Sequence, residues 1–174
     1  MKDMTVSKAL LWIFVAEILS IIGGFVLGGI LGIVAFVLNL LALYGAGKLD
    51  KGYNTAFVLS IAGIVLSVLS LINSTVLNTI ISVVSTVVNL AILYFVITTT
   101  CKLLEGNGNA DVAAKGVTVW KINLICAVAS VVLTLLGLIS LVLAGIMAII
   151  VGIVALVGGI LYMVFLWKSH KALA

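Results

Sequence analysis

Three long apolar stretches set the hydrophobic pattern of the chain, over residues 9–47, 52–101 and 122–167. A membrane-spanning helix needs about 20 predominantly apolar residues, so each stretch is too long for one crossing and long enough for two. Glycine, asparagine or serine residues interrupt each stretch near its middle. The pattern predicts an all-α integral membrane protein with six transmembrane helices, over about residues 9–26, 29–47, 54–72, 77–100, 121–140 and 144–167.

The predicted helices form one membrane domain made of three consecutive hairpins, over about residues 9–47, 54–100 and 121–167. The longest polar connection, at 101–120, joins the second hairpin to the third. Within it, Asn107-Gly108 is a turn signal, so we expect the fourth helix to stop at Gly106. A short interfacial helix over 111–120 is then expected to lead into the fifth crossing.

Charged residues are scarce and sit at the ends of the predicted crossings. The chain is 65% hydrophobic and 8% charged, whereas soluble domains carry about 25% charged residues, which excludes a soluble globular protein. All nine basic residues are lysines, and all nine fall on the same side of the six-helix arrangement. Lysine-rich connections face the cytoplasm. Both termini are therefore predicted inside, and the lysine-rich, arginine-free composition favours a bacterial cytoplasmic membrane.

Several function classes find no support in the sequence. The lysines form no stripe or cluster of the kind that binds nucleic acid. No Cys, His and carboxylate cluster suggests a metal, no His is placed to activate a nucleophile, and no phosphate-binding loop occurs. We therefore expect neither an enzyme nor a cofactor, with no catalytic residue and no metal ligand.

Glu17 is the strongest functional lead, because it is the only Asp, Glu, Lys, Arg or His within the three apolar stretches. It lies nine residues after Lys8, about 13 Å along a helix and near the middle of a hydrocarbon layer about 30 Å thick. A carboxyl group at that depth is costly and usually has a partner or a function. We expect an intramembrane polar site made of Glu17, Ser20, Asn39 and Asn89.

Two hypotheses compete for this site. In one, Glu17 exchanges a proton or cation as a substrate passes. In the other, a neutral Glu17 locks the first, second and fourth helices together through hydrogen bonds, each worth about 0.6 kcal/mol. We expect Glu17 to hold its proton much of the time, because hydrocarbon disfavours the charged form and no lysine reaches this depth.

The segment Ala16-Glu17-Ile18-Leu19-Ser20 resembles the first helix of small multidrug resistance exporters. In that family a lone membrane glutamate after alanine binds protons and cationic drugs in turn. The likeness covers five residues, and the family's four helices and shorter chain do not match the remaining pattern. The resemblance implies what such a glutamate can do, as an analogy.

Small and hydroxylated residues recur at helical spacing, as expected where helices pack closely in lipid. We interpret them as packing contacts within the chain, with a homo-oligomeric interface or a pore lining as alternatives. The stripes of the third and fourth helices are the favoured pore wall. The residues concerned are Gly24, Gly28, Gly32, Ser60, Gly63, Ser67, Ser70, Thr79, Ser82, Thr86, Ala144, Ala148 and Gly152.

The sequence favours a multi-pass protein that passes an ion or small solute through the membrane, proton-linked through Glu17 and oligomeric. The alternative is a non-transporting accessory, scaffold or immunity-type subunit that binds other membrane proteins through its helices. A cavity that reaches Glu17 would favour the first function. An apolar core with an exposed small-residue face would favour the second.

Overall fold

The computed structural model describes residues 4–26, 30–70, 72, 75–137 and 140–174. No strand occurs in this part of the chain. Each of the six helices is long and apolar enough to cross a membrane, which confirms the all-α class and indicates a membrane-embedded protein. The helices are α1 (Val6–Val26), α2 (Ile30–Gly47), α3 (Lys51–Leu69), α4 (Thr75–Gly106), α5 (Ala110–Gly137) and α6 (Leu141–Ala172).

Polar residues fix the helix ends in the connection between α2 and α3. The backbone of Asp50 is extended, and its side chain accepts a hydrogen bond from the Gly52 amide at 2.7 Å. An aspartate at this position satisfies an amide that the first helical turn leaves without a partner. This cap starts α3 at Lys51, three residues before the predicted start.

The helix α4 ends at Gly106, as predicted from the Asn107-Gly108 turn signal. Gly108 has a φ of +76°, and the Asn109 amide donates to the Leu104 carbonyl at 2.8 Å. Glycine takes this left-handed conformation without strain, and the two features form a Schellman-type helix end. The chain therefore reverses within residues 107–109.

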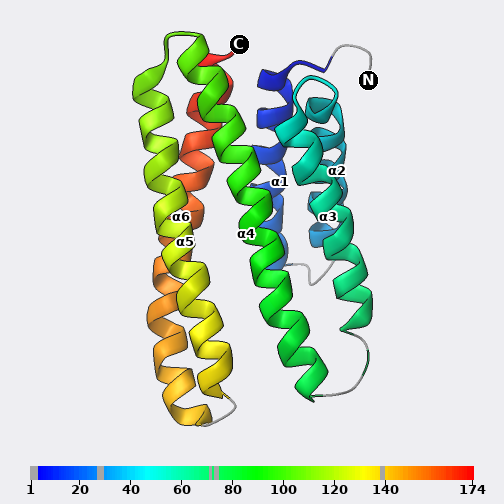
Figure 1. The fold of residues 1–174 in the computed structure, drawn as a ribbon, viewed down its shortest axis with the longest axis vertical. Helices are drawn as coiled ribbons and strands as arrows, with labels where there is room; N and C mark the ends of the chain where they lie inside the picture. The colour runs from blue at the N-terminus through cyan, green and yellow to red at the C-terminus, as the bar shows by residue number, and fades with distance from the viewer. Residues whose placement is uncertain (1–3, 27–29, 71, 73–74, 138–139) are drawn as a thin grey trace.

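Residues 111–120 are helical, as predicted, but they form the first turns of α5 and not a short helix of their own. Residues 110–137 form one continuous helix, because no glycine turn or proline breaks the chain at the predicted boundary near 120. The helices α4 and α6 each have 32 residues, about 48 Å, so they are longer than a hydrocarbon layer of about 30 Å. The helices α1 and α2 are shorter and end well before the distal ends of α5 and α6 (Figure 1).

The six helices form a closed ring. Each helix contacts its neighbours in sequence, and α6 also contacts α1. The helices of each pair α1–α2, α3–α4 and α5–α6 contact each other. Contacts of α2 with α3 and of α4 with α5 join one pair to the next. The Ser7 hydroxyl donates to the His170 carbonyl at 2.9 Å and also lies 2.8 Å from His170 Nδ1, which joins the start of α1 to the end of α6.

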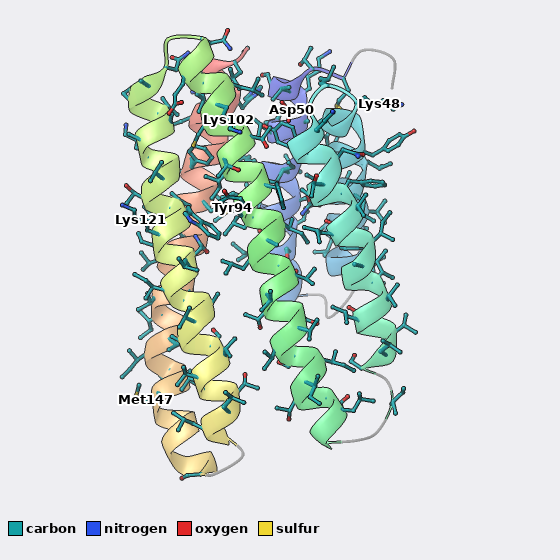
Figure 2. All side chains as sticks on the ribbon, in the orientation of Figure 1. Lys48, Asp50, Tyr94, Lys102, Lys121 and Met147 are labelled. Carbon is teal, nitrogen blue, oxygen red and sulfur yellow. The ribbon has the colours of Figure 1, made fainter. Side chains whose placement is uncertain are left out.

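One end of the ring carries the start of α1, the end of α6 and the connections at 48–50 and 107–109, and we call it the lysine end (Figure 1). Lys48, Asp50 and Lys102 lie at this end, whereas Met147 lies near the opposite, distal end (Figure 2). The well-packed core also lies toward the lysine end. Its largest fully buried side chains are Leu10, Ile13, Leu43, Tyr53, Ile97, Leu104, Phe165 and Leu166.

The outside of the ring is apolar. Large hydrophobic side chains are exposed on all six helices, and Ile33, Val65, Ile125 and Ile153 each expose more than half of their surface. Contiguous apolar surface of this kind is unfavourable in water and is the expected exterior of a protein in lipid. The exterior and the helix lengths thus agree on a membrane-embedded ring.

Candidate functional site

A cavity of about 670 Å³ lies inside the ring, and all six helices contribute to its wall. Apolar residues such as Ile64, Ile92 and Leu93 form part of the lining. The remainder carries amide, hydroxyl and carboxyl groups. These polar lining residues are Glu17, Asn39, Ser60, Ser67, Ser85, Asn89, Asn123 and Tyr162.

The packed core closes the cavity toward the lysine end. Val96 lines the cavity, and one turn further along α4 the fully buried Thr100 meets the fully buried Tyr53 of α3. The Tyr53 Oη and Thr100 Oγ1 atoms are 2.7 Å apart, and Thr100 Oγ1 donates to the Val96 carbonyl at 2.6 Å. This hydrogen bond joins α3 to α4 between the cavity and the lysine end of the ring.

Glu17 faces this cavity from α1, next to the buried Ala16. In the described part of the chain its carboxyl group has no hydrogen-bond or ion-pair partner. The amides of Asn39 and Asn89 likewise form no hydrogen bond with any described residue. Among the described residues, therefore, no hydrogen bond of the proposed lock joins Glu17 of α1 to Asn39 of α2 or Asn89 of α4.

The structure thus brings three of the four predicted polar-site residues to one cavity, namely Glu17, Asn39 and Asn89. The fourth, Ser20, is exposed and lies outside the lining. Ser20 follows Glu17 by three residues, so its side chain is rotated by about 300° around the helix axis, which is about 60° short of a full turn. This difference in direction places the Ser20 side chain outside the cavity.

Part of the polar stripe predicted on α3 lines the cavity. Ser60, Gly63 and Ser67 line the cavity, and the hydroxyl groups of the two serines donate to the carbonyls of Ala56 and Gly63. Ser70 is exposed at the end of α3, where its hydroxyl donates to the Ser67 carbonyl. The serines therefore satisfy their donors within α3 and present acceptor lone pairs to the cavity.

The predicted stripe of α4 is placed differently. Thr79, Ser82 and Thr86 are not among the lining residues, and Thr86 donates to the Ser82 carbonyl. The cavity face of α4 instead contains Ser85 one turn before Asn89. Ser85 and Asn89 are four residues apart and share one face of α4, whereas Thr86 lies between them on another face. Thr79 and Ser82 precede the lining residues of α4.

The small residues do not mark close contacts between helices of one chain where the structure describes them. A Cβ atom added at Gly32, Gly63 or Gly152 would meet no atom within 4 Å, and Ala148 is exposed. Gly24 lies in α1 and Ala144 lies in α6, but the structure does not describe the surroundings of these two residues. Gly28 lies outside the described residues.

Three polar lining residues were missed from the sequence: Ser85, Asn123 and Tyr162. Asn123 donates to the Val119 carbonyl at 2.9 Å, and Tyr162 is buried on α6. An asparagine near the start of an apolar stretch could have been flagged as costly in lipid. Tyr162, near the end of such a stretch, instead fits the pattern of an interfacial aromatic residue.

The charge of the lining limits what the cavity can bind. Glu17 is its one acidic residue, and no Lys, Arg or His is among the described lining residues. No group of three or more potential metal ligands occurs in the described part of the chain. Oxygen acceptors and amide donors are therefore set among apolar side chains, and the one carboxyl group in the lining can hold a proton or a single positive charge.

Comparison with protein-family models, with curated proteins and with solved structures finds no match for this chain. The functional argument consequently depends on the cavity, its lining and its position in the ring.

Proposed function

We propose that the protein is a small-solute transporter of the bacterial cytoplasmic membrane, with three hairpins and both termini in the cytoplasm. Lys48 and Lys102 lie at one end of the ring, and Lys121 lies further along α5 (Figure 2). The bias of lysines toward this end supports the orientation, because positively charged connections are retained inside. The cavity then has its sealed end toward the cytoplasm.

The observation that carries the proposal is the carboxyl group of Glu17 inside a cavity lined by all six helices, without a partner in the described part of the chain. A buried carboxyl that only stabilised the fold would be expected to form hydrogen bonds with nearby amides. Glu17 and the amides of Asn39 and Asn89 instead share one cavity without bonding to one another.

The substrate class follows from the same lining. One carboxyl group can hold a proton or a single positive charge, but two cations would repel each other at that site. The amide and hydroxyl groups around it can accept hydrogen bonds from an ammonium-type donor. We infer exchange of a proton on Glu17 for a small monovalent cation.

Proteoliposomes test this function directly. The purified protein is reconstituted with a pH-sensitive dye inside, and outward gradients of potassium, sodium or methylammonium are imposed in turn. We expect at least one cation gradient to drive proton movement above that of empty liposomes. Glu17→Gln keeps the shape and hydrogen-bonding capacity of the side chain but cannot titrate, so coupled proton movement should be lost.

A matched control separates this effect from a change in overall charge. Glu105→Gln makes the same chemical change at an exposed position on the lysine end of α4 and should retain the flux. Equal flux in wild type and Glu17→Gln would contradict the proton-exchange role. Absence of coupled flux with all three cations would favour a non-transporting function.

The alternative remains a non-transporting accessory, scaffold or immunity-type subunit that uses its helices as contact surfaces. One observation favours it: Ala148 and Gly152 form an exposed small-residue stripe on α6. Small residues allow helices of separate membrane proteins to approach closely. Bulky Gly152→Leu should abolish co-purification of a partner or a second copy if this surface is an interface.

A further inference from the structure

A second site lies on the outer surface of the ring, between α5 and α6 near the lysine end. A groove of about 230 Å³ runs between the two helices, and we call it the lysine groove. Lys115 and Thr118 of α5 and Lys168 of α6 line its polar part. Leu161 and Val164 line its apolar part, further along α6 toward the distal end.

The two lysines of this groove carry uncompensated charge. Both side chains are exposed, and neither has a carboxylate partner in the described part of the chain. By contrast, Lys48 and Lys171 lie over the aromatic rings of Tyr44 and Trp167, at 4.4 and 4.8 Å from the ring centroids. The lysine groove therefore offers two ammonium groups, from adjacent helices, to one anion.

An apolar groove of about 370 Å³ follows the other side of α6, against α1. Phe14, Ile18, Val164 and Trp167 are among its lining residues, all of them apolar. Val164 belongs to both grooves, so the two channels flank a single ridge on α6. The charged part of one groove and the apolar parts of both thus lie next to one another.

This arrangement matches the chemistry of a phospholipid with an anionic headgroup. Lysine ammonium groups avoid hydrocarbon, and Lys115 and Lys168 lie toward the lysine end, where a headgroup can reach them. Lys121 lies further along α5, outside the groove. Basic pockets between transmembrane helices bind anionic headgroups through such pairs of cations. Leu161 and Val164 expose 36% and 44% of their surface at the depth where acyl chains begin.

We propose that this surface binds one anionic phospholipid. Its phosphate lies between Lys115 and Lys168, and its two acyl chains lie in the two grooves on either side of Val164. The site is separate from the central cavity, and the proposal does not depend on what the cavity transports.

Native mass spectrometry of the full chain in detergent micelles tests the proposal. Palmitoyl-oleoyl phosphatidylglycerol is the anionic probe, and phosphatidylcholine with the same chains is the neutral probe. For wild type we expect the first phosphatidylglycerol adduct to form with about tenfold higher affinity than the phosphatidylcholine adduct. The double variant Lys115→Gln/Lys168→Gln should lose this preference.

The matched control is Lys51→Gln/Lys121→Gln, which removes two exposed lysines from outside the groove with the same change in net charge. It should retain the preference, and equal loss in both double variants would overturn the site. Displacement of the lipid adduct by millimolar inorganic phosphate would identify a simple anion site and overturn a lipid site. Equal affinity for single-chain lysophosphatidylglycerol would overturn the placement of two chains.

Discussion

The hydrogen bond between Tyr53 and Thr100 lies at the closed end of the cavity, and its contribution to the free energy of unfolding can be measured. Both side chains are fully buried, and their oxygen atoms are 2.7 Å apart. The Thr100 hydroxyl donates to the Val96 carbonyl, so its oxygen is the acceptor and the Tyr53 hydroxyl is the donor. The two partners are therefore not equivalent, and their substitutions should have unequal effects.

Tyr53→Phe removes the donor and leaves Thr100 bonded to Val96. The expected loss in the free energy of unfolding is about 1 kcal/mol, the net value of one hydrogen bond. Thr100→Val removes the acceptor and leaves the tyrosine hydroxyl buried without a partner, which costs about 1–3 kcal/mol. The double variant should resemble Tyr53→Phe alone, because no unpaired group is left behind.

Equilibrium unfolding in detergent, followed by tryptophan fluorescence, measures these differences. Thr98→Val is the control, because Thr98 Oγ1 donates to the Tyr94 carbonyl at 2.6 Å in an exposed hydrogen bond, and the residue is only half-buried. We expect that substitution to change the free energy of unfolding by less than about 0.5 kcal/mol. A larger loss for Tyr53→Phe than for Thr100→Val would refute the assigned donor and acceptor.

Two further outcomes are expected. Gly116→Ala should lower thermal stability, because the new Cβ would lie 2.5 Å from Cys101 Sγ and 2.7 Å from the Phe165 ring, and overpacking costs about 1–3 kcal/mol. Gly152→Ala meets no atom within 4 Å and should not destabilise. Equal melting temperatures would contradict the packing of α5 against α4 and α6. In a background without the native cysteines, Ser67→Cys should react with a membrane-impermeant thiol reagent added on the distal side. Ile153→Cys, 62% exposed but on the apolar exterior, should not react, since lipid excludes water there.

The six helices could be predicted from the sequence because lipid makes the length of an apolar run informative. A helix in hydrocarbon must satisfy all its backbone groups internally, so an uninterrupted apolar run of sufficient length implies a crossing. The turn at Gly108 was equally readable, since asparagine followed by glycine favours a left-handed residue. The continuous start of α5 was not readable, because residues 111–120 suit an interfacial helix and the first turns of a long helix equally well.

The lining of the cavity was predicted only in part. Glu17 and Asn39 stood out because charged and amide side chains are costly in lipid. Ser85 and Tyr162 did not, because their place in the wall depends on how each helix is rotated about its axis. Most faces of α6 are apolar, so its sequence has no periodic pattern that fixes this rotation.

The two proposed functions, transport and an accessory role, differ in whether the closed end of the cavity at Tyr53 and Thr100 must open. A transporter must open the cavity toward the lysine end during its cycle. A cysteine at Ser67 should then also react, more slowly, with a reagent confined to the lysine side of sealed vesicles. Thr100→Val weakens the contact between α3 and α4, so it should raise that rate while leaving Ile153→Cys unreactive. An accessory subunit has no need to open there, and a Ser67→Cys variant that reacts only from the distal side, with or without Thr100→Val, would argue against transport through this cavity.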